Sequence, residues 1–455
     1  MTKEKNMLDV IDIKDHYLEV FSRFEKELEA DEDSPMHRLR ESAIGRFAEL
    51  GFPTAHDEEW RFTNIATLTR LSFGRASTSI PKNLTVSELD ILTFGNWDCH
   101  RLVFVNGALA RELSDISKTC GFELKNLREA LHQDPRSVET HLAKYADCDD
   151  HAFVALNTAF LDDGAFIRIP KNFVVEKPIH LMFVSTAGTE PAMAHPRLLL
   201  VAEPNSQATV VESYLSLDSR SAFTNAVTEI VLGENAAIDH YKVERQNRET
   251  FHVATLQVQQ NRGSCFSSHS ITTGGALARN DVNAVLDGEG CECTLNGLYM
   301  ATDKQLIDNH TRIDHAKPHC TSHELYKGIL DGQARGVFNG KIYVHQDAQK
   351  TDAKQTNKTL LLSEDAVINT KPQLEIFADD VKCTHGATVG QLAEEAIFYL
   401  RSRGIGREDA RSLLTFAFAN DIIGRIKVEP VRRHLEEMLL AGRSQAEREE
   451  IKEAP

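Results

Sequence analysis

The spacing of hydrophobic positions changes twice along the chain and divides it into three regions. From about residue 8 to 69, and again from about 394 to 440, apolar residues recur every three or four positions, as on amphipathic helices. From about residue 153 to 389 the period shortens to two, in short runs broken by glycine, asparagine, aspartate and proline. The pattern predicts a β-rich core between two helical regions.

Local signals place some of the element boundaries. Ser34 and Pro35 can cap and open a helix that ends at Gly51. A strand is expected at Arg101–Asn106 and a helix at Leu127–Tyr145. At the C-terminal end three helices are predicted: Glu394–Arg403, stopped by Gly404, then Arg407–Ile423 and Val431–Leu440.

A loose unit recurs in the β-rich core: an apolar pair, turn residues, a small residue and an alternating strand. Copies begin at Val201, Val231, Val285, Leu330 and Leu361, at irregular spacings of a few tens of residues, which is typical of stacked repeats. Strands that repeat without intervening helices fit a β-solenoid or a β-sandwich better than a parallel α/β sheet. Periodicity alone does not choose between the first two.

Composition and charge narrow the function classes. The 455 residues suffice for two or three domains or for one elongated repeat structure with appendages. Lys and Arg number 51 against 68 Asp and Glu, a net charge of -17, which argues against nucleic acid or an anionic membrane as the main partner. Eight cysteines without a secretory signal, and no long apolar run, predict a cytoplasmic chain with reduced thiols and no membrane span.

The most informative stretch runs from Asp379 to Gly390, because it places Cys383 and His385 two residues apart. On a strand, both side chains would project from the same face. Thiol and imidazole are both ligands for iron and other transition metals. The alternative interpretation is a buried small thiol beside a surface histidine.

A second group of candidate ligands lies between His310 and His323 and also includes His315, His319 and Cys320. A zinc site needs its ligands to converge, but on an extended segment Cys320 points away from the face shared by His319 and His323. A polar face with hydrogen-bonded imidazoles is therefore the favoured interpretation. His315, Cys320 and His323 remain as further metal-ligand candidates.

Cys291 and Cys293 follow a turn and would share one strand face. They occupy the repeat position filled elsewhere by Ala236-Ala237-Ile238, which favours interior packing, because free cysteine behaves as a small apolar residue.

Motifs for nucleotide binding and nucleophilic catalysis are missing. The sequence has no G-x-x-x-x-G-K-[ST] loop, no G-x-G-x-x-G opening a helix and no G-x-S-x-G elbow. If ATP drives the work of this protein, another subunit must bind the nucleotide.

Several segments together carry a family resemblance: 57–64 (Asp-Glu-Glu-Trp-Arg-Phe-Thr-Asn), the continuous run 327–357, 379–390 and 401–405. They resemble the SufB/SufD family of the SUF iron–sulfur cluster assembly machinery. The resemblance implies a mainly β fold: a right-handed parallel β-helix core at 151–390, an N-terminal helical and mixed region at 1–150, and a C-terminal helical domain at 391–455.

The same resemblance implies a function. A SufD-type chain is a non-catalytic scaffold that pairs with SufB and binds the SufC ATPase through its C-terminal helices, with a homodimer as a further arrangement. His385 matches the histidine contributed near the nascent iron–sulfur cluster at the SufB interface, and Cys383 matches a family cysteine. The cluster is expected to be bound there only transiently.

Two departures favour the SufD branch over SufB. Residues 359–374 contain no cysteine where SufB has its cluster-bearing one, and Gly386 follows His385 where SufB-like chains tend to have an acidic residue. Three alternatives stay open: a SufB-type paralogue, a stand-alone metal-binding β-helix enzyme that uses the His310–His323 group, and an adaptor that only increases SufC occupancy.

Overall fold

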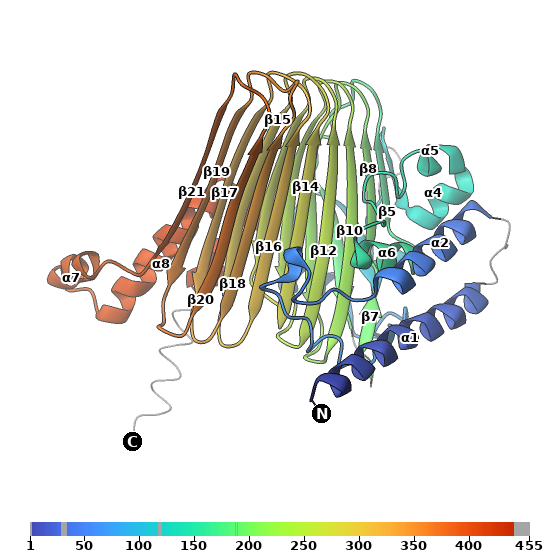
Figure 1. Ribbon diagram of the computed structural model, residues 1–455, viewed down its shortest axis with the longest axis horizontal. Helices are drawn as coiled ribbons and strands as arrows, with labels where there is room; N and C mark the ends of the chain where they lie inside the picture. The colour runs from blue at the N-terminus through green and yellow to red at the C-terminus, as the bar shows by residue number, and fades with distance from the viewer. Residues whose placement is uncertain (1, 29–33, 117–120, 187, 189, 441–455) are drawn as a thin grey trace.

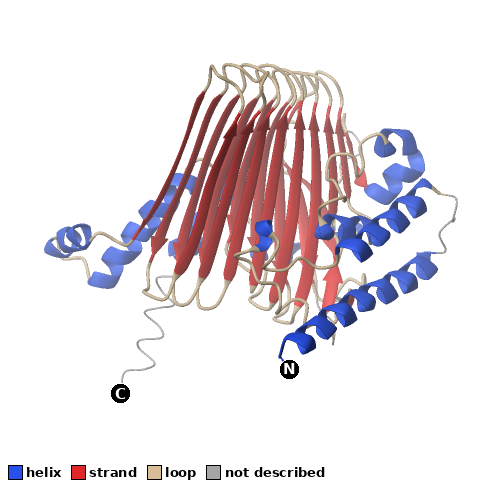
Figure 2. Ribbon diagram, in the orientation of Figure 1, coloured by secondary structure: helices blue, strands red, loops and turns tan. Residues whose placement is uncertain are grey.

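Two long, facing β-sheets form the body of the protein, with helices at both ends (Figure 1, Figure 2). The computed structural model describes residues 2–28, 34–116, 121–186, 188 and 190–440. Along the core, consecutive strands alternate between the two sheets, and neighbouring strands within each sheet run parallel. The chain therefore winds as a parallel β-solenoid with helical ends. This confirms the predicted fold class and decides against the sandwich.

The first sheet contains, in spatial order, β20 (Val367–Ile376), β18 (Arg335–Val344), β16 (Leu306–His315), β14 (Leu277–Leu286), β12 (Thr250–Gln260), β10 (Ala222–Leu232), β8 (Arg197–Ala202), β5 (Ala165–Ile169) and β4 (Glu123–Asn126), with β7 (Ala192–Ala194) and β1 (Gly74–Arg75) joined beside β10. The second sheet contains β21 (Lys382–Gly390), β19 (Asp352–Leu361), β17 (Thr321–Leu330), β15 (Glu292–Ala301), β13 (Cys265–Thr272), β11 (Ala237–Arg245), β9 (Gln207–Ser216), β6 (Ile179–Ser185), β2 (His100–Val105) and β3 (Ala108–Leu109).

Side chains alternate between the interior and the solvent along each strand. On β19, Ala353, Gln355 and Asn357 are buried, whereas Lys354 and Lys358 are exposed. Because parallel neighbours are in register, inward residues of successive turns stack in columns through the solenoid. Removal of these apolar columns from water is the main stabilising contribution.

One corner of the solenoid repeats the same backbone conformation turn after turn. Six residues there have φ between 55° and 73°: Asn205, Asn235, Gly263, Gly290, His319 and Lys350. Each is followed by a small buried residue: Ser206, Ala236, Ser264, Cys291, Cys320 and Thr351. Asparagine and glycine are favoured there because they tolerate the left-handed region. Cys291 and Cys293 are both buried, as their repeat position predicted.

The N-terminal helices are α1 (Thr2–Leu28) and α2 (Pro35–Leu50), and α2 packs against α6 (Ala152–Ala159). The Ser34 hydroxyl accepts a hydrogen bond from the His37 amide at 3.2 Å, and Gly51 has φ 65° at the end of the helix. These two predicted boundaries are confirmed. The helical pattern expected to extend to residue 69 is not observed beyond Leu50, except for the 3-10 helix η1 (Glu58–Trp60).

The region before the solenoid contains α3 (Val86–Leu92), the 3-10 helix η2 (Arg111–Leu113), α4 (Leu127–Gln133) and α5 (Pro135–Glu139). The predicted helix at 127–145 is therefore wrong in its continuity. Proline lacks a backbone N–H, so Pro135 starts a new helix, and the Asp134 carboxylate caps it by accepting a hydrogen bond from the Ser137 amide.

At the C-terminal end, α7 (Glu394–Ser402) projects from the body, α8 (Arg407–Ile423) lies against the second sheet, and residues 429–440 are helical (Figure 1). Residues 441–455 lie outside the described part. Ile422 and Ile423 pack in one cluster with Tyr241 and Ile271 of the second sheet. Lys327 on β17 fastens α8: its Nζ donates to the Phe418 carbonyl at 2.9 Å and to Asp421 at 2.8 Å.

We expect Lys327→Ala to loosen α8 from the sheet. The variant removes two hydrogen bonds and the contact of the Lys327 ammonium with the Phe418 ring, at 4.3 Å from the ring centroid. Because Asp421 is partly solvated, the cost should be about 1–2 kcal/mol of unfolding free energy. Denaturant unfolding, with limited proteolysis near residue 405, would measure it. Lys354→Ala, at an exposed position of β19, is the matched control and should change neither measurement.

Candidate functional site

Among the described residues, the solenoid ends in a turn that no further strand covers. Strands β20 and β21 are the terminal strands of their sheets, so within the described chain each pairs on one side only, with β18 and β19 respectively. Large apolar side chains are exposed on this turn, including Phe377 at 57% and Val389 at 46%. Unpaired strand edges together with exposed apolar groups are typical of a surface that pairs with another chain. We call this turn, residues 367–390, the open end.

Cys383 and His385 both lie on β21, at this open end. Their register partners on β19 are Ala353 and Gln355, which are 1% exposed and point into the solenoid. Cys383 and His385 therefore occupy inward-facing positions, with the open edge beside them. His385 is exposed, whereas Cys383 is half-buried against a small apolar cluster. Burial and the nearby Asp352 carboxylate raise the pKa of the Cys383 thiol.

The inward column below His385 is polar for two turns. Gln355 donates from Nε2 to Glu324 Oε2 at 2.9 Å, and Glu324 is 3% exposed. Burial raises the pKa of Glu324 to about 7, although the hydrogen bond from Gln355 opposes the rise. The imidazole at the open end thus stands above an amide and a carboxyl group that can take up or release a proton near neutral pH.

The residues between His310 and His323 do not converge. His315 points inward at the end of β16 and contacts Ser322 Oγ through Nε2 at 2.9 Å, Cys320 is buried at the corner, and His323 lies exposed on the outer face of β17. His310 lies on the outer face of the first sheet. Across the described residues, no three or more His, Cys, Asp or Glu side chains are grouped so that they could hold a metal ion.

Sequence reasoning missed what the segment 57–64 does: it is fastened to the outer face of the first sheet. The Glu59 carbonyl accepts from Arg279 at 2.7 Å, and the Glu59 carboxylate contacts His310 Nδ1 at 3.1 Å. His310 Nε2 also lies 3.1 Å from Asp308. The Arg279 guanidinium stacks 3.8 Å from the Trp60 ring centroid. No local sequence signal could have revealed these contacts, since Glu59 lies outside the strands and is 251 residues from His310.

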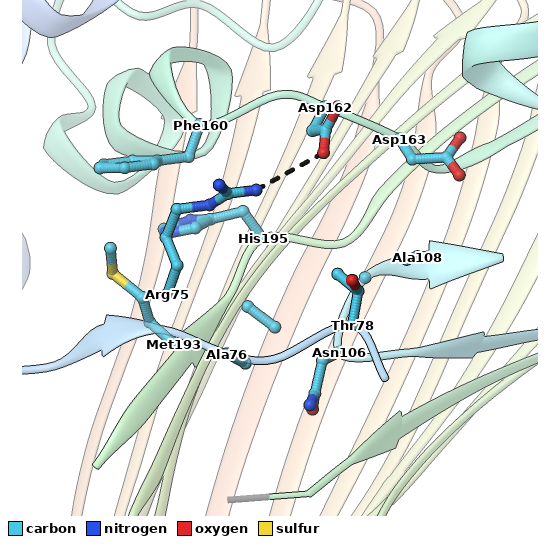
Figure 3. A pocket seen from close by; sticks show the side chains of 12 residues that line it. Arg75, Ala76, Thr78, Asn106, Ala108, Phe160, Asp162, Asp163, Met193 and His195 are labelled. Carbon is cyan, nitrogen blue, oxygen red and sulfur yellow. Dashed lines mark ion pairs between the residues drawn. The ribbon is translucent and has the colours of Figure 1, made fainter. Parts of the chain in front are cut away.

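A small cavity of about 40 Å³ lies where Arg75, Asp162 and His195 meet (Figure 3). His195 stacks on Phe160 with ring centroids 5.0 Å apart, and burial together with the Arg75 charge lowers its pKa to about 3. A space of this size admits a water molecule rather than a substrate. We therefore interpret this cavity as a small gap in the packing of the N-terminal region and not as a binding site.

The geometry defines a class of protein: a β-solenoid with one open end that presents a thiol and an imidazole on its last strand. The described chain contains no helix of the length and apolarity that a membrane crossing requires.

Comparison with known proteins identifies the family. Residues 183–418 match the model of the SUF system FeS cluster assembly SufBD core domain, and residues 11–181 match that of the SufBD protein N-terminal region. The chain belongs to the SufBD family.

Individual relatives of the chain belong to the same family. The chain is 35% identical to an iron–sulfur cluster assembly SufBD family protein of Synechocystis over 94% of this chain and 97% of the relative. It is 34% identical to the iron–sulfur cluster assembly protein SufD of Escherichia coli over 85% and 88%. It is 27% identical to SufD of Bacillus subtilis over 93% and 97%. The predicted resemblance is confirmed, and the chain is a SufD-type member of the SUF iron–sulfur cluster assembly system.

The contact between His310 and Glu59 generates a pH prediction. Burial would lower the pKa of His310, but the Asp308 and Glu59 carboxylates raise it from 6.5 to about 9. A raised folded-state pKa contributes stability that is complete below pH 6.5 and is lost as the pH rises through 9. The shift corresponds to at most about 3 kcal/mol.

We therefore expect the wild type to be more stable than His310→Gln at pH 7, and this difference to shrink towards pH 10. Thermal unfolding of both proteins across this range would measure it. His323→Gln, at an exposed histidine, should show no such pH-dependent difference. A constant difference between wild type and His310→Gln would rule out the imidazolium as its cause.

Proposed function

We propose that this chain is the non-catalytic, SufD-type scaffold subunit of a cytoplasmic SUF complex, in which it pairs with a SufB chain and binds the SufC ATPase. The observation that carries the proposal is the inward-facing, exposed His385 on the last, singly paired strand of the open end. A ligand at that position can face a partner chain and remain fixed by the register of β21 on β19.

The open end suits pairing with SufB. Its two strand edges can accept further strands, and the apolar side chains of Phe377 and Val389 would leave water on docking. The same features would support a homodimer when SufB is scarce. The acidic net charge of -17 is compatible with basic surfaces on partner chains.

The C-terminal region suits SufC. Helix α7 stands away from the solenoid and exposes Phe398 at 73% and Tyr399 at 57% (Figure 1). Exposed aromatic side chains on a projecting helix are typical anchors of a protein interface. This chain then binds no nucleotide itself, and ATP hydrolysis belongs to SufC.

The cargo is an iron–sulfur cluster under assembly. The His385 imidazole, with Cys383 beside it, would ligate iron or the nascent cluster transiently at the SufB interface. Imidazole is a neutral ligand and thiolate a charged one, so a histidine-ligated cluster is suited to later release. His315, Cys320 and His323 lie apart from this interface and have no part in the proposal.

His385→Ala tests the assignment. The complex would be co-expressed with cognate SufB and SufC and purified without oxygen, and its iron and acid-labile sulfide would be measured. We expect both to fall to near background in an intact complex, because the interface loses a ligand. His323→Ala is the matched control and should keep wild-type content. Unchanged content in His385→Ala would leave the chain an adaptor that only increases SufC occupancy.

A pair of variants separates the two partner surfaces. Phe377→Asp should weaken retention of SufB while SufC stays bound, and Phe398→Asp should do the reverse. Placing a charge in an apolar contact at the centre of an interface costs about 2 kcal/mol or more, roughly a 30-fold rise in Kd. Co-purification followed by titration of the partners would measure both effects. Loss of the same partner in both variants would contradict the assignment.

A further inference from the structure

We propose that Cys291 and Cys320 form an oxidisable dithiol, a modification site at which a hydroperoxide converts the two thiols into a disulfide. They occupy neighbouring turns of the corner column. The Thr321 amide donates to the Cys291 carbonyl at 2.9 Å, and the β15–β17 register begins one residue later with Glu292 opposite Thr321. Adjacent strands are about 4.8 Å apart, within the range of about 4.4–6.8 Å between the Cα atoms of a disulfide.

The two sulfur atoms converge on one point. Cys291 Sγ and Cys320 Sγ each lie 3.1 Å from the carbonyl oxygen of Gly288. Cys291 Sγ also lies 3.1 Å from the Asn261 carbonyl. Side chains that share one acceptor lie side by side.

The two thiols also differ in pKa. Contact between the two thiols lowers the pKa of Cys291, against the effect of burial, and raises the pKa of Cys320. A thiol that loses its proton more readily, beside one that keeps its proton, is the arrangement of an attacking and a resolving cysteine.

The backbone on one side of each thiol is exposed to solvent. Both are buried, but each directly follows an exposed residue, Gly290 and His319, in the short turns of the corner. Hydrogen peroxide is little larger than water, and local opening of such a turn would admit it. Cys293 is a natural comparison: it lies two residues further along the chain, on β15, faces the core, and burial raises its pKa.

The reaction balances with the hydroperoxide as oxidant. The Cys291 thiolate attacks the O–O bond, an S–O bond forms, the O–O bond breaks, and the leaving oxygen takes up a proton to give water or an alcohol. Cys320 sulfur then attacks the sulfenic acid, the S–S bond forms, the S–OH bond breaks, and the hydroxide leaves as water with the Cys320 proton. Two electrons pass from the sulfur atoms to the peroxide.

The competing explanation is that both cysteines are merely small residues. Ser206, Ala236, Ser264 and Thr351 fill equivalent corner positions, and the column needs small side chains there. That explanation accounts for the burial of both cysteines and predicts thiols that stay inert.

The full chain, reduced and then treated with hydrogen peroxide, distinguishes the two explanations. Remaining thiols would be alkylated and the peptides mapped by mass spectrometry. We expect a Cys291–Cys320 disulfide, reversed by dithiothreitol, and loss of the Cys291 thiol more than about tenfold faster than that of Cys293. The Cys293→Ser variant should form the same disulfide at the same rate.

In Cys320→Ser, Cys291 should advance to sulfinic acid, because no resolving thiol is present. If that variant does not fold, the mapping of the wild-type chain decides alone. The proposal is overturned if Cys291 and Cys320 stay fully alkylatable while the exposed Cys265 is oxidised, or if the recovered disulfide joins other cysteines. This site is independent of the function proposed for His385, and neither result bears on the other.

Discussion

The in-register parallel pairing of successive turns is the constraint on which the rest of the structure depends. It forces each inward residue to lie beside the inward residue at the same position of the next turn. Each inward side chain must therefore fit its neighbours in the adjacent turns as well as those in its own turn. Glycines that face tyrosines of the adjacent turn show how strict this steric requirement is. A Cβ on Gly297 would lie 2.2 Å from the Tyr326 ring, and one on Gly328 would lie 2.3 Å from the Tyr299 ring.

The same constraint explains why the two ends of the solenoid differ. At the N-terminal end the sheets finish in the short strands β3 and β4, which pair antiparallel to β2 and β5, and β4 packs against α4. At the C-terminal end, β20 and β21 leave their outer edges without a partner strand in the described chain. Stacked repeats need capped ends for solubility, and bare strand edges favour association. A chain capped at one end only is suited to meeting a partner at the other.

Sequence reasoning reached a β-solenoid or β-sandwich core because the period-two pattern and the recurring corner unit are local signals, and the family resemblance chose the solenoid. The shared face of Cys383 and His385 was accessible for the same reason, since strand parity follows from a spacing of two. The break of the predicted 127–145 helix at Pro135 is also a local signal, one that the apolar period outweighed. Contacts across long separations could not be predicted, because they depend on how segments distant in the sequence pack together. The contact of Glu59 with His310 and the convergence of Cys291 and Cys320 belong to this class.

Under the proposed function, the open end explains why the site must be shared. An iron–sulfur cluster is held by about four ligands, and β21 offers a thiol and an imidazole at inward positions of a single strand. No group of three or more potential ligands exists elsewhere among the described residues. The remaining ligands would come from the partner chain, so the ligand set exists only while the two open ends are joined. Any motion that parts the subunits would then divide the ligands between them and release the cluster, which couples a change in subunit arrangement to transfer without a catalytic group in this chain.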